Sequence, residues 1–141
     1  MFIVNLSVFA QKSACNIKNG FAVAGYDLIS YFDGKAVKGK LEHVFIYNDI
    51  KYQFSTNKNL NKFKSNPEKY LPQYGGWCAY AMGKKGKKVD MDPKIFEIRD
   101  DKLYLFYNSY FNNTYKKWIN EDTQKLQQKA DVNWRKVIRK E

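Results

Sequence analysis

Two pairs of aromatic and β-branched segments along this chain predict β-hairpins. Each pair flanks two residues suited to a tight turn, Asn48-Asp49 in the first and Asp100-Asp101 in the second. Residues 89–91 predict a further short strand, which should end in a turn at Asp92-Pro93. The expected hairpin strands are residues 43–47 with 50–54, and residues 96–99 with 103–107.

Apolar residues at helical spacing predict helices between and after the hairpins. Three of these helices should begin at residues suited to cap a helix N-terminus: Asp27, Ser55 or Thr56, and Asp122. The first expected helix presents Leu28, Tyr31 and Phe32, the second covers residues 57–65, and the third runs from Gly75-Gly76 to about Gly83. A fourth should place Phe111, Tyr115, Trp118 and Ile119 on one face, and a last helix carries Leu126 and Ala130.

These elements predict one α+β domain over residues 21–141, with an antiparallel sheet built from two hairpins, packed by short helices and a C-terminal helical segment. Residues 1–20 are interpreted as a signal-peptide remnant and tail. Their apolar run ends in Val8-Phe9-Ala10, which suits cleavage after the alanine. The run lacks basic residues and is short for a signal, so an N-terminal strand is the alternative. The signal hypothesis predicts a periplasmic or secreted protein without a transmembrane segment.

The chain has 141 residues, a formal net charge of +11 and a pI of about 9.5. Such a charge attracts anionic surfaces, although the codon usage of an AT-rich genome would explain a lysine-rich composition equally well. Arginine, which makes the better bidentate contacts with bases and phosphates, is limited to Arg99, Arg135 and Arg139. We therefore expect an anionic surface or an acidic protein as partner, rather than nucleic acid.

One tight cluster of lysines is the candidate anion-binding site. Lys84, Lys85, Lys87 and Lys88 are interrupted only by a glycine, so we expect a basic loop after the short helix. Such a loop can contact anionic lipid, polysaccharide or an acidic partner. The alternative is a solvated loop without a partner, which is the commoner role of a short charge run.

The candidate metal site centres on Cys78 and Met82. If their segment is helical, a spacing of four residues puts a thiol and a thioether on one face, and both are soft ligands of the kind that copper(I) prefers. His43 or Met91 could complete such a site. The alternative is that both sulfur side chains pack in the core, since the chain has no CxxC motif and no pair of histidines.

Cys78 could also act as a reactive thiol at a helix N-terminus. A nucleophile needs a base within reach, and His43 is the only histidine, on an expected strand. We therefore expect a buried, inert cysteine and no enzymatic activity. A disulfide between Cys15 and Cys78 remains open, although the position of Cys15 near the chain terminus favours free thiols.

Several motifs between about residues 20 and 137 follow one another in a characteristic order. They are Gly25-Tyr26-Asp27, Tyr31-Phe32, Tyr52-Gln53-Phe54, Asn66-Pro67-Glu68-Lys69-Tyr70, Tyr74-Gly75-Gly76-Trp77-Cys78-Ala79-Tyr80, Asp92-Pro93, Lys102-Leu103-Tyr104-Leu105, Ala130-Asp131 and Asn133-Trp134. In this order they resemble the stand-alone YHS-domain proteins.

The resemblance implies a link to metals, because short YHS modules are associated with heavy-metal handling. The cysteines of those modules correspond here to Ser55 and Asn59, so that metal site is expected to be absent, whereas His43 matches the family's histidine. The sequence as a whole predicts a small YHS-type binding module for a soft, copper-like metal ion or a small ligand. The alternative is a non-catalytic structural or interaction protein whose basic surface contacts anionic partners.

Overall fold

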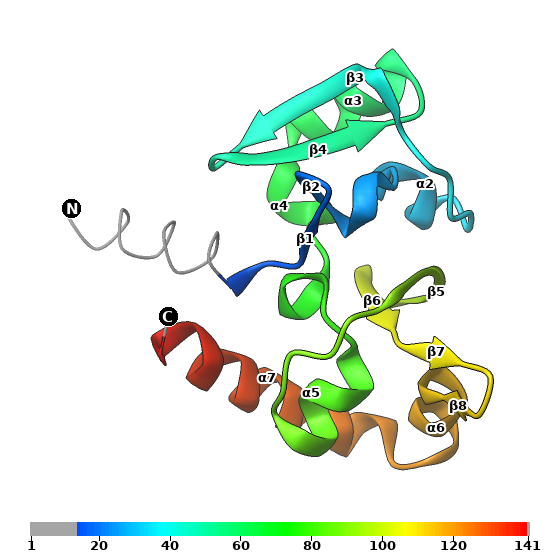
Figure 1. The fold of residues 1–141 in the computed structure, drawn as a ribbon, viewed down its shortest axis with the longest axis vertical. Coiled ribbons are helices and arrows are strands. Elements are labelled where there is room, and N and C mark those ends of the chain that lie inside the picture. Colours follow the sequence, from blue (N-terminus) through cyan, green and yellow to red (C-terminus); the bar gives the residue numbers. More distant parts are fainter. Residues whose placement is uncertain (1–13, 141) are drawn as a thin grey trace.

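The computed structural model describes residues 14–140, and its helices and two-stranded antiparallel sheets confirm the α+β class (Figure 1). The strands are β1 (Ile17–Lys18), β2 (Phe21–Ala22), β3 (Lys40–Tyr47), β4 (Ile50–Phe54), β5 (Asp92–Arg99), β6 (Lys102–Phe106), β7 (Asn108–Ser109) and β8 (Asn112–Asn113). The α-helices are α2 (Leu28–Phe32), α3 (Asn57–Ser65), α4 (Pro67–Tyr70), α5 (Ala79–Lys85), α6 (Thr114–Asn120) and α7 (Thr123–Lys140). Two short 3₁₀ segments are η1 (Val23–Gly25) and η2 (Gln73–Gly76).

Both predicted hairpins form. Strand β3 pairs with β4 and β5 pairs with β6, and both turns contain residues with positive φ, between 50° and 64° at Asn48, Asp49, Asp100 and Asp101. The two hairpins do not join into one sheet. One edge of β6 is instead taken by short parallel bridges from Pro72 and Cys78, so it is not open to β4.

The short strand predicted over residues 89–91 is wrong, as is the turn after it. Strand β5 begins at Asp92, which pairs with Phe106, and it includes Pro93. The pairing register shifts between Asp92 and Phe96. Proline cannot donate a ladder hydrogen bond and is tolerated at such an irregularity, which the sequence pattern did not indicate.

The three predicted helix caps are confirmed. Asp27 accepts hydrogen bonds from the backbone N–H groups of Ile29 and Ser30 at the start of α2. Thr56, rather than Ser55, caps α3. Asp122 accepts from the backbone N–H of Lys125 at the start of α7.

The folded part of the chain begins earlier than expected. Strands β1 and β2 form a hairpin, and the side chain of Asn16 is buried, where it donates to the carbonyl oxygen of Gly76 at 3.3 Å and to the carboxylate of Asp90 at 3.0 Å. Residues 14–20 therefore belong to the fold and not to a tail. The signal peptide predicted near the N-terminus falls on residues 1–13, which lie outside the described residues.

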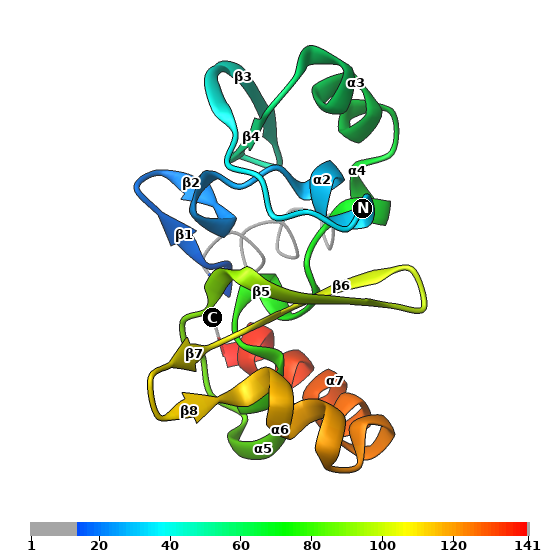
Figure 2. The same ribbon diagram turned by 90° about the vertical axis from the view of Figure 1, so that its right-hand side faces the viewer.

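The core consists of two hydrophobic clusters that meet at β6. An upper cluster in the view of Figure 1 lies among α2, α3 and the β3–β4 hairpin, and a lower cluster lies among α5, α6 and α7. Figure 2 shows β5 and β6 crossing between these two parts. Side chains of β6 alternate between the clusters: Leu103 and Leu105 join the upper one, while Tyr104 and Phe106 join the lower one.

Candidate functional site

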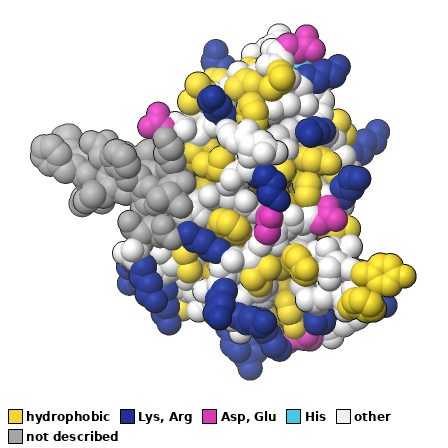
Figure 3. Space-filling view, in the orientation of Figure 1, with side chains coloured by type: hydrophobic (Ala, Val, Ile, Leu, Met, Phe, Trp, Pro, Cys, Tyr) yellow, Lys and Arg dark blue, Asp and Glu magenta, His cyan; other side chains and the backbone are white. Residues whose placement is uncertain are grey.

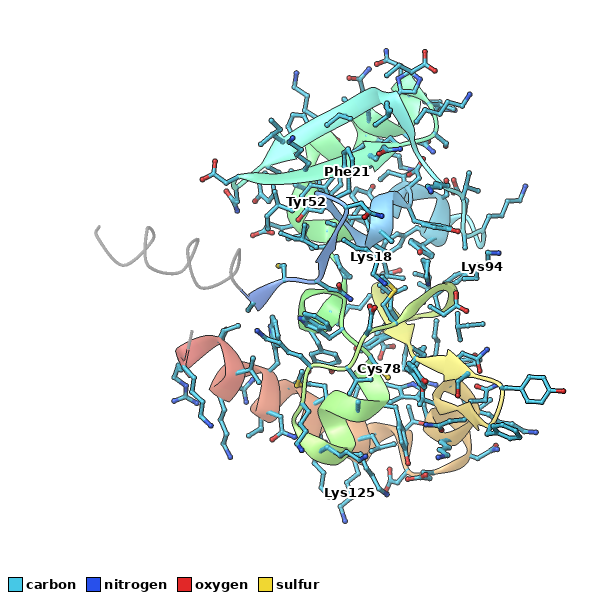
Figure 4. All side chains as sticks on the ribbon, viewed as in Figure 1. Lys18, Phe21, Tyr52, Cys78, Lys94 and Lys125 are labelled. Atoms are coloured by element: carbon cyan, nitrogen blue, oxygen red, sulfur yellow. The ribbon has the colours of Figure 1, made fainter. Side chains whose placement is uncertain are left out.

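Cys78 lies at the N-terminus of α5, in the lower part of the molecule, and is completely buried (Figure 4). Gly75 and Gly76, just before it, have φ values of 60° and 85°, so the helix predicted to start at these glycines begins only at Ala79. A Cβ atom at Gly75 would lie 2.8 Å from the ring of Trp134 in α7. Glycine at this position therefore permits both the turn and the close approach of the C-terminal helix.

The thiol of Cys78 has a defined hydrogen-bond partner. Its sulfur lies 3.4 Å from the hydroxyl oxygen of Thr114, at the start of α6, and that hydroxyl donates to the carbonyl oxygen of Tyr107. Because a hydroxyl has one proton, the thiol must be the donor to Thr114. This bonded, buried thiol matches the expectation of an inert cysteine better than that of a nucleophile.

The four predicted metal ligands do not gather at one place. Met82 packs in the lower cluster, whereas Met91 belongs to the upper cluster. His43 lies on β3, which pairs with β4 and packs on α3, away from Cys78 and α5. Among the described residues, no three His, Cys, Asp or Glu side chains could hold a metal ion together.

Ser55 and Asn59, which the resemblance to YHS modules aligns with metal-binding cysteines, both bind Asp27 here. The backbone N–H and the hydroxyl of Ser55 donate to one carboxylate oxygen of Asp27 at 2.8 and 2.6 Å, and the side-chain amide of Asn59 donates to the same oxygen at 2.9 Å. The other oxygen caps α2. The fully buried carboxylate of Asp27 thus accepts five hydrogen bonds and joins α2, β4 and α3.

A small hollow of about 100 Å³ lies between the β3–β4 turn and the C-terminal helix. It is lined mainly by apolar and aromatic side chains, including Tyr47, Tyr52, Leu71 and Trp134, together with Cys15. Burial raises the pKa of the Cys15 thiol to about 11, although the charge of Lys88 acts in the opposite direction. Cys15 and Cys78 are both free thiols, so the disulfide that the sequence left open does not form.

The predicted anion-binding lysines are divided between a helix and the segment that follows it. Lys84 and Lys85 form the last turn of α5, which ends at Gly86 with a φ of 66°. Lys87 and Lys88 follow that glycine, and the ammonium of Lys88 lies 5.9 Å from the ring centre of Trp77. The expected basic loop is therefore partly helical.

Lysines of α7 extend this basic surface. An open groove of about 560 Å³ between α5 and α7 is lined by Lys84, Lys85, Lys125 and Lys129. We call it the basic groove; Lys125 projects at the lower edge of Figure 4, where Figure 3 shows a concentration of basic side chains. Lys125 and Lys129 were not predicted from the sequence, although their spacing of four places them on one face of a helix.

The basic groove has carboxylates at one end. Glu121 accepts hydrogen bonds from Lys84 at 3.0 Å and from the hydroxyl of Tyr80 at 2.7 Å, and these bonds lower its pKa. Asp122 is nearby, where its side chain caps α7. Four lysines thus lie beside two carboxylates, and this excess of positive charge favours an anionic partner.

Models of known protein families, curated proteins and solved structures were compared with this chain, and none of them matches it. The resemblance to YHS-domain proteins therefore rests on the sequence motifs alone. In the part of the chain that the structure describes, no helix has the length and apolar character needed to cross a membrane.

Proposed function

We propose that this protein is a non-catalytic binding module whose basic groove contacts anionic partners. The observation that carries the proposal is the convergence of lysines from two helices, Lys84 and Lys85 from α5 with Lys125 and Lys129 from α7, on one open groove. Positive charges gathered at one place raise the local concentration of an anionic partner more than the same charges spread over the whole surface.

Close packing of α5 on α7 supports this proposal. A Cβ atom at Gly83 would lie 2.6 Å from the carbonyl oxygen of Leu126, so glycine is what lets the two helices approach. The side-chain amide of Asn133 also donates to the carbonyl oxygen of Met82 at 2.8 Å. The lysines of the groove are therefore presented by two helices in fixed contact, which limits the entropy lost when a partner binds.

Heparin affinity chromatography tests the proposal, since heparin is a polyanion without an apolar part. In one variant, Lys84, Lys85, Lys125 and Lys129 are changed to glutamine; in the control, the exposed Lys51, Lys58, Lys62 and Lys64 are changed in the same way. Both variants lose the same net charge. We expect the groove variant to elute at a clearly lower NaCl concentration than the control. Equal elution would show that net charge alone accounts for binding and would contradict the proposal.

A second candidate function is binding of a small apolar molecule in the hollow beside Cys15. The aromatic lining of this hollow, with Tyr52 and Trp134 on different elements, favours this function. Its volume of about 100 Å³ suits a ligand no larger than a single ring. Phenol should shift the NMR signals of residues around the hollow, and Ala22→Leu, which fills the space, should abolish these shifts. Identical shifts in the variant would contradict this function.

A further inference from the structure

The β7–β8 hairpin carries two aromatic side chains that face solvent. Tyr110 is 95% exposed and Phe111 is 94% exposed, and their rings touch each other edge to face with centres 5.1 Å apart. Figure 3 shows hydrophobic side chains standing out beyond the outline of the molecule on the side where Figure 1 places β7 and β8. We call residues 108–113 the aromatic finger.

Folding does not explain these two residues. They form the connection of a two-residue hairpin, since Asn108 pairs with Asn113 and Ser109 pairs with Asn112. Such connections favour glycine, asparagine and aspartate, not large aromatic residues. Tyr110 and Phe111 also bury almost no apolar surface here, so packing does not explain them either. Two adjacent, fully exposed rings at the tip of a hairpin instead indicate a surface that another molecule covers.

The base of the aromatic finger adjoins the basic groove. A second hollow, of about 260 Å³, is lined by Asn112 of the finger, by Lys117 of α6 and by Lys84 and Lys85 of α5. Lys84 and Lys85 line the basic groove as well. The apolar tip and the positive charges therefore belong to one continuous surface that runs from β7–β8 across α5 to α7.

One residue that lines this second hollow, Asn112, has an unsatisfied acceptor. The side-chain oxygen Oδ1 of Asn112 is buried and has no hydrogen-bond partner among the described residues. Leaving a buried acceptor without a partner is costly, and native structures rarely do so.

We propose that this surface docks on an anionic phospholipid bilayer, with Tyr110 and Phe111 inserted at the level of the headgroups. The proposal rests on the proposed function, because it identifies the anionic partner of the basic surface as a membrane. Lys84, Lys85 and Lys117 contact the lipid phosphates. Aromatic rings favour the membrane interface, and lysines near an anionic leaflet add electrostatic attraction.

The shape of the surface favours a bilayer over a protein partner. The aromatic finger is convex and projects from the molecule, so its rings can enter a fluid layer without a preformed pocket on the partner. Three lysines beside it complement negative charge that is distributed over an area, as it is in an anionic leaflet.

Co-sedimentation with vesicles of phosphatidylcholine, with and without phosphatidylglycerol, tests the proposal. The finger variant is Tyr110→Ser combined with Phe111→Ser. Its control is Leu41→Ser on β3, which removes a side chain that is 78% exposed on the other part of the molecule. Both sites are at the surface, so both variants should fold, and circular dichroism checks this.

We expect the wild type and Leu41→Ser to bind phosphatidylglycerol vesicles, and the finger variant to bind them about tenfold or more weakly. All three proteins should bind heparin equally, because the groove lysines are unchanged. Binding of the finger variant to the vesicles as tightly as the wild type would overturn the inference. So would equal binding of the wild type to vesicles with and without phosphatidylglycerol.

Two other outcomes would assign the aromatic finger to another partner and also overturn the inference. One is a concentration-dependent dimer that the finger variant abolishes, which would point to a second copy of this chain. The other is a wild type that binds neither kind of vesicle but shows the groove-dependent heparin binding described above, which would leave the proposed function standing without a membrane. Equal heparin elution of the groove variant and its lysine control would instead contradict the proposed function.

Discussion

The thiol of Cys78 donates a hydrogen bond to the hydroxyl of Thr114, and this contact joins the N-terminal ends of α5 and α6 inside the lower part of the molecule. Both side chains are buried. The hydroxyl of Thr114 in turn donates to the carbonyl oxygen of Tyr107, just before the aromatic finger. Cys78, which the sequence singled out as a candidate metal ligand, is thus the first member of a short chain of buried hydrogen bonds.

Thr114→Val should lower the free energy of unfolding by about 1–3 kcal/mol, because it leaves the buried Cys78 thiol without its acceptor while keeping the volume of the side chain. The Tyr107 carbonyl also loses its bond from the hydroxyl and keeps only the backbone N–H of Thr114 as a donor. Urea denaturation monitored by tryptophan fluorescence measures this change. Thr114→Ser is the matched control, since it keeps the hydroxyl and loses only a methyl group. Equal stability of Thr114→Val and the wild type would show that the hydrogen bonds contribute nothing.

Copper(I) binding tests the metal prediction made from the sequence. Because the Cys78 thiol is buried and hydrogen-bonded and His43 lies on β3, we expect the reduced wild type and Cys78→Ser to give the same titration curve against a competing chelator. Cys15→Ser serves as the matched thiol control. Loss of one copper equivalent in Cys78→Ser alone would instead restore the soft-metal function that the sequence favoured.

Asp27→Asn should be among the most destabilising single substitutions, at about 3 kcal/mol. An amide NH₂ in place of one carboxylate oxygen would face the donors of Ser55 and Asn59, so buried donors would meet without an acceptor between them. Asp33→Asn, at the exposed end of the same helix, should change stability by less than about 0.5 kcal/mol. Similar urea midpoints for the two variants would contradict the role assigned to Asp27.

Asp90 should make the protein sensitive to acid. Partial burial acts to raise the pKa of its carboxyl, but hydrogen bonds from Lys18, Asn16 and the Met91 amide outweigh burial and hold the pKa below its usual range. The carboxylate therefore stabilises the fold above its unfolded-state pKa of about 3.9, and this contribution is lost as the pH falls through the lower folded-state value.

The measurement is the free energy of unfolding between about pH 5 and pH 2, the window set by the direction of this shift. Wild type should lose more stability over this window than Asp90→Asn, which lacks the titrating group. Asp49→Asn, in an exposed turn, should behave like the wild type. An Asp90→Asn variant with the acid sensitivity of the wild type would contradict the link between β1 and Asp90.

Local signals in the sequence predicted most of the secondary structure. The turns at Asn48-Asp49 and Asp100-Asp101 and the caps Asp27, Thr56 and Asp122 were recognisable because each depends on a few neighbouring residues. The β1–β2 hairpin was missed, although Asn19-Gly20 between Ile17 and Phe21 is a strong hairpin signal. The apolar run over residues 1–10 favours a leader and tail in this region, which is why the pattern did not predict the hairpin.

The candidate site was harder to predict, because it depends on residues far apart in the chain. Nothing local indicates that α7 brings Lys125 and Lys129 beside Lys84, or that Gly83 allows the contact. The exposure of Tyr110 and Phe111 could not be predicted from the sequence either, because aromatic residues at this spacing fit a helix that packs in the core. The sequence placed Phe111 on such a helix, whereas α6 begins only at Thr114.

Strand β6 contributes side chains to both clusters of the core, so the two parts of the molecule depend on each other for stability. Loss of either cluster would expose one row of β6 side chains and remove the support on which the other row packs. Neither part can therefore be expected to persist alone, and cutting the chain between them would not yield two stable fragments. Unfolding should occur in a single cooperative step, and the amide hydrogens of Leu103 to Phe106 should exchange only when the whole molecule opens.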